Sequence, residues 1–248
     1  MNAIEVSRKS SVMTITLNNP DRGNALSPGM VQEINQALDR AEAKSQALVI
    51  FQGAGKHFCT GFDLSDLADV DDDILLSRVI QIELLLARIW SAPFITLALA
   101  KGRTFGAGAD LVASCDRRFA ETGASFSFPG ASFGLVLGTR RLGERIGRDT
   151  AQNLILSGAT ISDTDSLKVG LLHALVGEAD EIEALIEVET MTAKRLNEIT
   201  RKQISQALNP DMAALDNDLA NLVRSACAPG LKKRIEDYRA SVMAARQK

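Results

Sequence analysis

The sequence predicts an α/β fold, in which short strands alternate with helices around a shared apolar core. Residues 47–51 and 94–100 are continuously apolar, which is typical of strands buried on both faces of a sheet. Residues 31–41 and 75–90 instead carry apolar side chains at helical spacing. Because these strands and helices take turns along the chain, we expect a mainly parallel sheet covered by helices.

The first expected strand spans residues 12–17, where apolar side chains are followed by the turn sequence NNPDRGN. A helix is expected to begin after Ser27, because serine is a favourable N-cap and Pro28 suits the first helical position. The next strand, residues 47–51, leads into GAGKHFCTGFDL, a loop with three glycines.

The three aspartates at 71–73 are expected to open a second helix, since acidic groups favour a helix N-terminus. This helix should stop before Pro93, and the strand at 94–100 then leads into a second glycine-bearing loop, KGRTFGAG. The later pattern predicts a short helix at 109–115, short strands at 118–120, 124–128 and 174–176, and otherwise helices from Arg140 onward.

Composition excludes several classes of function. The 28 Lys and Arg residues against 31 Asp and Glu residues give a net charge of −3, which predicts no nucleic-acid partner. Two His and three Cys without a ligand-type spacing predict no metal site. No apolar run approaches the roughly 20 residues of a membrane span, so no membrane partner is expected. An odd number of cysteines and no evident signal peptide favour the cytoplasm.

The two glycine-bearing loops carry the functional signal, because each follows an apolar strand and precedes the start of a helix. Gly61 lets one backbone approach a ligand closely, and Ala107 stands at a helix N-terminus where N–H groups are free. One N–H group from each loop would form an oxyanion hole. Asp110, one helical turn further on, would place a carboxylate beside the polarised carbonyl for proton transfer. The alternative without a catalytic role is that the loops are ordinary turns and that Asp110 is a solvated or helix-capping residue.

Four segments, in this order and spacing, resemble the crotonase (enoyl-CoA hydratase/isomerase) superfamily. They are NNPDRGNALSPGMVQEI, GAGKHFCTGFDL, GAGADLVASCDRRFA and FSFPGASFGL with its following GTRRL. The resemblance covers about residues 4–175 and is looser in the C-terminal helices. It implies a crotonase-like spiral of β-β-α repeats at 1–190 and a helical oligomerisation region at 191–248, which would build a homotrimer or a dimer of trimers.

The resemblance also implies a substrate and a site. The substrate would be an acyl-CoA thioester that reacts through an enolate, with coenzyme A as part of the substrate and no other cofactor. The oxyanion donors would be the backbone N–H groups of Phe62 and Ala107, and Asp110 would be the acid/base. Further substrate contacts are implied at Arg22, Ala25, Lys56, Gly61, Asp63, Leu64, Ser65, Gly108 and Gly130.

The sequence departs from the family pattern at its second carboxylate. The hydratases of the family use two glutamates; the first is replaced by Asp110, as in the dienoyl-CoA isomerase branch, and Gly130 stands in place of the second. Glu144 is the nearest acid that could substitute, although it also fits a solvated helix position. We therefore expect enoyl-CoA hydratase/isomerase chemistry first, with acyl-CoA decarboxylation, thioester hydrolysis or a catalytically impaired acyl-CoA-binding subunit as alternatives.

A serine hydrolase is the remote alternative. Residues 130–134 match the nucleophile motif G-x-S-x-G around Ser132, and Asp163 or Asp165 and then His173 follow in a suitable order. Pro129 argues against it, because proline interrupts the strand that should lead into such a motif. Cys59, beside the first loop, fits a small packed residue better than a reactive thiol.

Overall fold

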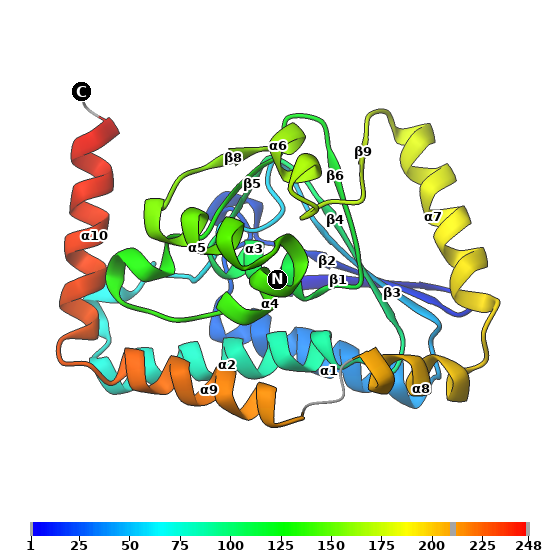
Figure 1. Ribbon diagram of the computed structural model, residues 1–248, viewed down its shortest axis with the longest axis horizontal. Coiled ribbons are helices and arrows are strands. Elements are labelled where there is room, and N and C mark those ends of the chain that lie inside the picture. The colour runs from blue at the N-terminus through cyan, green and yellow to red at the C-terminus, as the bar shows by residue number, and fades with distance from the viewer. Residues whose placement is uncertain (1, 209–211, 247–248) are drawn as a thin grey trace.

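The computed structural model describes residues 2–208 and 212–246 and is built around a six-stranded sheet (Figure 1). The strand order is β1-β2-β3-β4-β6-β9, in which β1 and β2 form an antiparallel hairpin and every later pair is parallel. The strands are β1 (Ile4–Lys9), β2 (Val12–Leu17), β3 (Leu48–Gly53), β4 (Ile95–Ala100), β6 (Arg117–Glu121) and β9 (Ala174–Val176).

The central strands are buried on both faces, as their continuous apolar sequence predicts. In β3, Val49 and Phe51 join the main core beneath the site-bearing helices, whereas Leu48 and Ile50 join a second cluster on the opposite face. This split follows the period of two along a strand. The second cluster is closed by α7 (Ala179–Lys194), which stands against that face of the sheet (Figure 1).

The helices on the main-core side begin where the sequence predicts. Ser27 accepts a hydrogen bond from the Met30 N–H at the start of α1 (Pro28–Ala43). Asp71 does the same for the Ile74 N–H at the start of α2 (Asp72–Trp90). Between β4 and β6 lies the short helix α3 (Ala107–Ser114), which is buried along its whole length and sits against α2.

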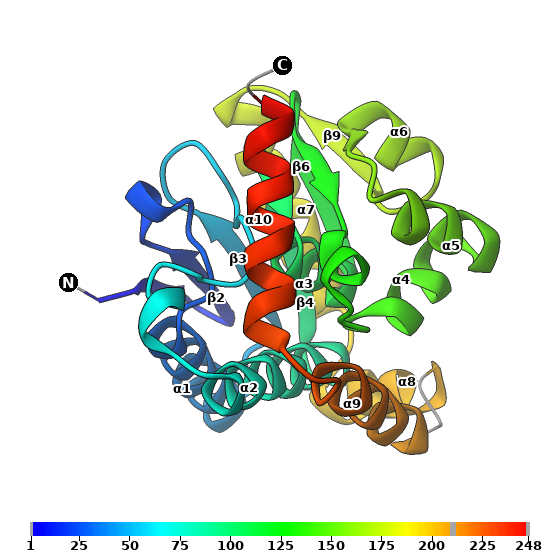
Figure 2. The ribbon, with the colours of Figure 1, turned by 90° about the vertical axis from the view of Figure 1, so that its left-hand side faces the viewer.

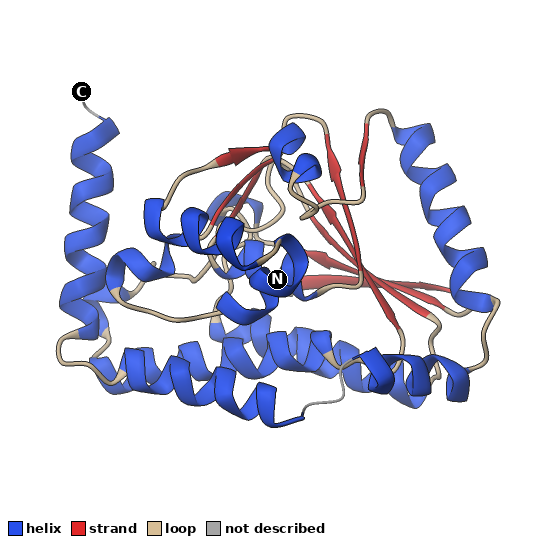
Figure 3. Ribbon diagram, in the orientation of Figure 1, coloured by secondary structure: helices blue, strands red, loops and turns tan. Residues whose placement is uncertain are grey.

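A smaller sheet and several short helices complete the site-bearing half of the molecule. The smaller sheet has the order β5-β7-β8, with β5 (Arg103–Phe105) parallel to β7 (Ser125–Ser127) and β8 (Ile161–Ser162) antiparallel to β7. Figure 3 shows these strands set apart from the large sheet. The short helices are η1 (Pro20–Arg22), η2 (Leu67–Asp69), η3 (Pro129–Phe133), α4 (Thr139–Ile146), α5 (Arg148–Ser157) and α6 (Asp163–Lys168).

The C-terminal helices are α8 (Glu198–Leu208), α9 (Met212–Ala226) and α10 (Leu231–Arg246). The helix α9 runs beside α2, and α10 rises from its end in front of the sheet (Figure 2). Asp72 at the start of α2 accepts hydrogen bonds from the Leu231 and Lys232 N–H groups, which fixes the base of α10. The expected division at residue 190 falls inside α7 and stays a prediction.

Three strands that the sequence did not predict are present. The strand β1 pairs with β2 across a two-residue turn, although only Ile4 among its residues is buried. The segment 101–108, expected to be a loop, contains β5, and α3 begins at Ala107 rather than at residue 109. The third strand is β8, which is only two residues long. Among the described residues, no helix is long and apolar enough to cross a membrane.

Candidate active site

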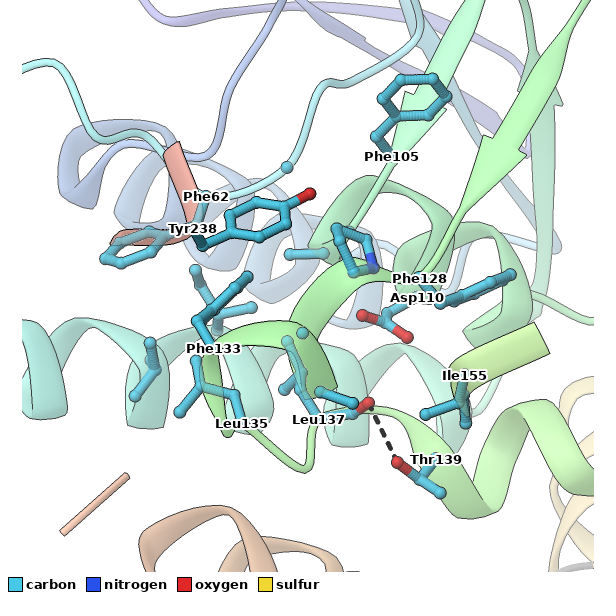
Figure 4. A pocket seen from close by; sticks show the side chains of 18 of the residues that line it. Phe62, Phe105, Asp110, Phe128, Phe133, Leu135, Leu137, Thr139, Ile155 and Tyr238 are labelled. Carbon is cyan, nitrogen blue, oxygen red and sulfur yellow. Dashed lines mark hydrogen bonds between the residues drawn. The ribbon is translucent and has the colours of Figure 1, made fainter. Parts of the chain in front are cut away.

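A cavity of about 250 Å³ lies where both glycine-bearing loops meet η3, α4 and α10 (Figure 4). Its wall is almost wholly apolar, with Phe, Leu, Ile and Val side chains contributed by several elements. Among the described lining residues, the polar side chains are Thr60, Asp110, Thr139 and Tyr238. An apolar cavity with a few polar groups is the usual form of a small-molecule site.

Backbone hydrogen bonds on either side of Phe62 hold the first loop in place. The Leu26 N–H donates to the Gly61 carbonyl at 2.7 Å, and the Asp63 N–H donates to the Leu26 carbonyl at 3.2 Å. These two bonds flank Phe62, and its own N–H has no acceptor in residues 2–208 and 212–246. Gly61 lines the cavity with φ near +102°, a left-handed value that favours glycine.

The second loop presents the first N–H of α3 in the same way. The Gly106 N–H donates to the Ser127 carbonyl at 2.8 Å, and the first bond inside α3 runs from the Asp110 N–H to the Gly106 carbonyl at 3.0 Å. The N–H of Ala107, the first residue of the helix, has no acceptor among the described residues, as is usual at a helix N-terminus.

The two loops are in direct contact, which brings these N–H groups to one wall. The Phe105 N–H donates to the Cys59 carbonyl at 2.9 Å. A Cβ atom added to Gly61 would lie 2.8 Å from the Phe105 carbonyl oxygen and 3.5 Å from the Ala107 nitrogen. A Cβ atom added to Gly108 would lie 2.3 Å from the Cys59 carbonyl oxygen. Glycine at both positions is therefore what allows the loops to approach.

Asp110 is the acidic side chain in the wall of this cavity. It is only 5% exposed, and no described residue donates a hydrogen bond to its carboxyl group, which faces the cavity interior in Figure 4. Burial raises the pKa of Asp110 well above its usual range, while the Arg141 guanidinium opposes this and the Glu83 carboxylate adds to it. A carboxyl group whose protonated form is favoured in this way is suited to acid/base chemistry.

The backbone of Gly138, just before α4, makes room for this carboxyl group. A Cβ atom added to Gly138 would lie 2.1 Å from Asp110 Oδ1 and 2.6 Å from its Cγ. Gly138 also has φ near +66°, a left-handed conformation. The sequence reasoning missed Gly138, although a glycine directly before a helix start is the kind of signal that could have identified it.

The structure brings some of the expected contact residues to the cavity and leaves others outside it. Gly61, Phe62, Leu64, Ala107, Asp110 and Gly130 line the cavity. The residues that do not line it are Arg22, Ala25, Lys56, Asp63, Ser65, Gly108 and Glu144. Of these, Arg22, Lys56 and Ser65 are exposed, Asp63 is half-buried, Ala25 is buried, and Gly108 packs against Cys59.

Glu144 is not brought to the site. It lies on the exposed side of α4, with 47% of its side chain accessible, and pairs with Arg140. The reason is its position two residues from both Leu142 and Ile146, which are buried, so that the helix turns Glu144 the other way. Among the described residues, Asp110 is therefore the only acidic side chain in the cavity wall.

The residues that a serine hydrolase would need do not come together. Ser132 is exposed in η3. His173 Nδ1 accepts a hydrogen bond from the Arg118 N–H, Asp163 accepts from the Gly123 and Thr164 N–H groups, and Asp165 pairs with Lys168. No contact joins Ser132 to His173 in the described part of the chain. Cys59 is buried, and burial raises the pKa of its thiol to about 12, which keeps it protonated.

Two lining residues that sequence reasoning did not assign to the site come from distant parts of the chain. Tyr238, from α10, packs against Phe133 with ring centroids 5.2 Å apart. Thr139, the first residue of α4, lies beside the Leu137 carbonyl (Figure 4). No local pattern marks Tyr238, because its place depends on how α10 packs on η3. Among the described residues, no group of three or more His, Cys, Asp or Glu side chains could hold a metal ion.

Comparison with known proteins points to one family. The enoyl-CoA hydratase/isomerase family matches residues 7–226 of the chain. The mouse mitochondrial enoyl-CoA hydratase domain-containing protein 3 is 31% identical over 203 residues, which cover 80% of this chain and 66% of that protein.

Solved structures of proteins named for the same family have a similar fold. A Bordetella parapertussis protein named for the enoyl-CoA hydratase/isomerase family has a TM-score of 0.93 at 38% identity, covering 97% of this chain and 99% of that one. An enoyl-CoA hydratase/isomerase from Xanthobacter autotrophicus Py2 has a TM-score of 0.84 at 27% identity, covering 99% and 96%.

Proposed function

Because the chain belongs to the enoyl-CoA hydratase/isomerase family and has its crotonase-like fold, we propose that it is an enzyme that moves a proton at the α-carbon of an acyl-CoA thioester. The observation that carries the proposal is the meeting of three groups in one apolar cavity. They are the N–H groups of Phe62 and Ala107, which have no acceptor among the described residues, and the carboxyl group of Asp110.

The two N–H groups would receive the thioester carbonyl oxygen. As a proton leaves the α-carbon, negative charge moves onto this oxygen, and two preformed donors in an apolar cavity stabilise it. Asp110 takes the proton in its ionised form and, once protonated, returns it to the acyl chain. Every proton removed is thus given back, and no cofactor beyond the coenzyme A of the substrate is required.

A single carboxyl group favours isomerisation of the double bond over hydration. Hydration needs one group to activate water and another to deliver a proton, whereas one carboxyl group can shuttle a proton between two carbons of the acyl chain. Asp110 has no second acid beside it among the described lining residues. The lining also offers no Lys, Arg or His in the described part of the chain, which disfavours decarboxylation of an acyl group that carries its own carboxylate.

The coenzyme A end of the substrate would meet the exposed side of the first loop. Lys56 is exposed on this loop. Arg22 is also exposed and lies beside the loop, because its carbonyl oxygen accepts a hydrogen bond from Thr60 Oγ1 at 3.5 Å. We assign these two cations to the phosphate groups, since their charge would steer an anionic ligand to the cavity mouth.

Assembly and location are part of the same proposal. We propose a homotrimer or a dimer of trimers, supported by large apolar side chains that α7 and α8 leave exposed in the single chain, namely Val188, Met191, Ile199, Ile204 and Leu208. Sedimentation at several concentrations tests this assembly.

We also propose a cytoplasmic location, supported by three cysteines that are all free.

The deciding experiment offers the purified protein a 3-enoyl-CoA and crotonyl-CoA separately, while the absorbance of the conjugated thioester is followed. We expect the absorbance to rise with the 3-enoyl-CoA, and Asp110→Asn to slow this rise by about 10²–10⁴-fold. Glu183→Gln, an exposed substitution on α7, is the matched control and should retain full activity. Tight coenzyme A binding with no turnover of either thioester would instead support an acyl-CoA-binding subunit.

A further inference from the structure

Behind the cavity wall lies a buried group of charges that the proposed reaction does not use. Arg141, on α4, has no exposed surface, and Glu83, on α2, is 1% exposed. Arg141 Nη2 donates to Glu83 Oε2 at 2.6 Å, and Nη1 donates to Asp218 Oδ2 at 3.1 Å. The buried atoms Arg141 Nε and Glu83 Oε1 have no hydrogen-bond partner among the described residues.

Such a group needs an explanation beyond stability. Replacing a buried ion pair by well-packed apolar residues is often neutral or stabilising, because the desolvation of both charges offsets their attraction. The two unbonded polar atoms make this pair a still weaker source of stability. Its place in the fold offers a different role, since Arg141 is three residues beyond Gly138, whose missing side chain leaves the space that the Asp110 carboxyl group occupies.

We propose that Arg141 and Glu83 are positioning residues that act through Asp110: Arg141 supplies the counter-charge of its carboxylate, and Glu83 limits the strength of that counter-charge. The role of this arrangement in catalysis rests on the proposed function. The electrostatic effect of Arg141 and Glu83 on Asp110 does not depend on that function. Burial favours the protonated form of Asp110, Arg141 favours the ionised form, and Glu83 weakens the effect of Arg141. This balance lets the carboxyl group be ionised in one step of the reaction and protonated in the next.

Other charges on the elements around α3 have partners elsewhere or lie at the surface. On α2, Arg78 pairs with Asp66, and Arg88 pairs with Asp39 and Glu42. On α4, Arg140 pairs with Glu144 and Asp218, and Arg145 donates to the Ala113 and Cys115 carbonyls. Arg103, on β5, is exposed, and β4 carries no charged side chain. Arg141 and Glu83 differ from these charges, because their sequence neighbours Leu142 and Ile82 line the cavity together with Asp110. They are therefore the described charged groups that we expect to act on Asp110, and each contributes to its pKa in the direction that its charge requires.

The test titrates Asp110 directly in protein labelled with ¹³C at the aspartate carboxyl carbons, with Asp110→Asn to assign its NMR signal. Substitution Glu83→Gln removes a negative charge, so the midpoint of Asp110 should fall by about one pH unit, the low end of what a nearby charge produces. The double variant Glu83→Gln with Arg141→Met removes both charges. Since Arg141 has the stronger influence of the two, the midpoint should then rise above that of the unchanged protein.

The control is Glu189→Gln. Glu189 is also buried and pairs with an arginine, Arg117, at 2.6 Å, but on the α7 side of the large sheet. The substitution Glu189→Gln should leave the titration of Asp110 unchanged. Circular dichroism confirms that each variant is folded, and the double variant, which leaves neither charge of the pair unpaired, covers the case in which Glu83→Gln does not fold.

Opposite shifts in the two variants support the proposal. Unchanged midpoints, or shifts in the same direction, overturn it. Because the titration uses no substrate, it is independent of whether the proposed reaction occurs. In variants that turn over a 3-enoyl-CoA, the acid limb of kcat/KM should move with the midpoint, which a purely structural role would not cause.

Discussion

Substituting Gly138 by alanine should separate the activity of the protein from its stability. The added Cβ atom would fall 2.1 Å from Asp110 Oδ1, which is closer than two non-bonded carbon and oxygen atoms can approach. The atoms closer than 3.0 Å are Oδ1 and Cγ of the Asp110 carboxyl group, with Cβ next at 3.1 Å, and the side chain borders a cavity. We therefore expect rotation about its Cα–Cβ bond to move the carboxyl group away. The fold should survive, but Asp110 would leave the place from which, in the proposed reaction, it reaches the α-carbon.

The expected magnitudes follow from the geometry. The left-handed backbone, with φ near +66°, costs an alanine about 1–2 kcal/mol of unfolding free energy. Displacing the proton-transfer group should slow turnover by about 10²–10⁴-fold. Gly158→Ala is the matched control, because Gly158 has φ near +60° and its added Cβ atom would meet only Ser132 Oγ, at an ordinary 3.5 Å.

Urea unfolding followed by circular dichroism and turnover of a 3-enoyl-CoA are the two assays. Both variants should lose similar stability, within about 1 kcal/mol of each other, while Gly138→Ala alone loses activity. If Gly138→Ala turns over as fast as Gly158→Ala, the position of the Asp110 carboxyl group does not govern the reaction, and the reasoning fails.

Two further predictions concern the loops and pH. Gly61→Ala should part the two loops, since its Cβ atom would lie 2.8 Å from the Phe105 carbonyl oxygen, and turnover should fall by about 10²–10³-fold. Gly123→Ala, with φ near +87° and nothing within 4 Å of its Cβ atom, is the control, and equal rates for the two variants would refute the idea. For pH, partial desolvation and the neighbouring Arg118 lower the pKa of His173, whose side chain is still exposed, from 6.5 to about 4. The unfolded chain then binds a proton that the folded chain does not, so the unfolding free energy should decrease as pH falls from about 6.5 to about 4. His173→Asn should flatten this slope, and an unchanged slope in urea unfolding would contradict the assignment.

Much of the fold was predictable because its signals are local. The N-caps at Ser27 and Asp71 and the buried strands β3 and β4 are marked by the residues that form them. The strand β1 was not, because it lies at a sheet edge with mostly exposed side chains, and its hairpin turn places Ser10 at φ near +58° where Asn or Gly would be the usual signal.

The candidate site divides in the same way. Phe62, Ala107 and Asp110 are each close in sequence to a glycine-bearing loop, and the structure brings all three to one cavity. Glu144 was chosen for its nearness in sequence, whereas the helical spacing of Leu142 and Ile146 already turns it outward on α4. Tyr238 depends on contacts between elements far apart in the chain, and no short segment encodes those.

The most direct test of the central claim is hydrogen–deuterium exchange at the α-carbon of a saturated acyl-CoA in D₂O, followed by NMR. This exchange reports enolate formation alone, whichever overall reaction the enzyme completes. The account predicts exchange of the α-protons by the unchanged protein and its loss in Asp110→Asn, with acyl-CoA binding retained in both. Binding without exchange in the unchanged protein, or undiminished exchange in Asp110→Asn, would contradict it.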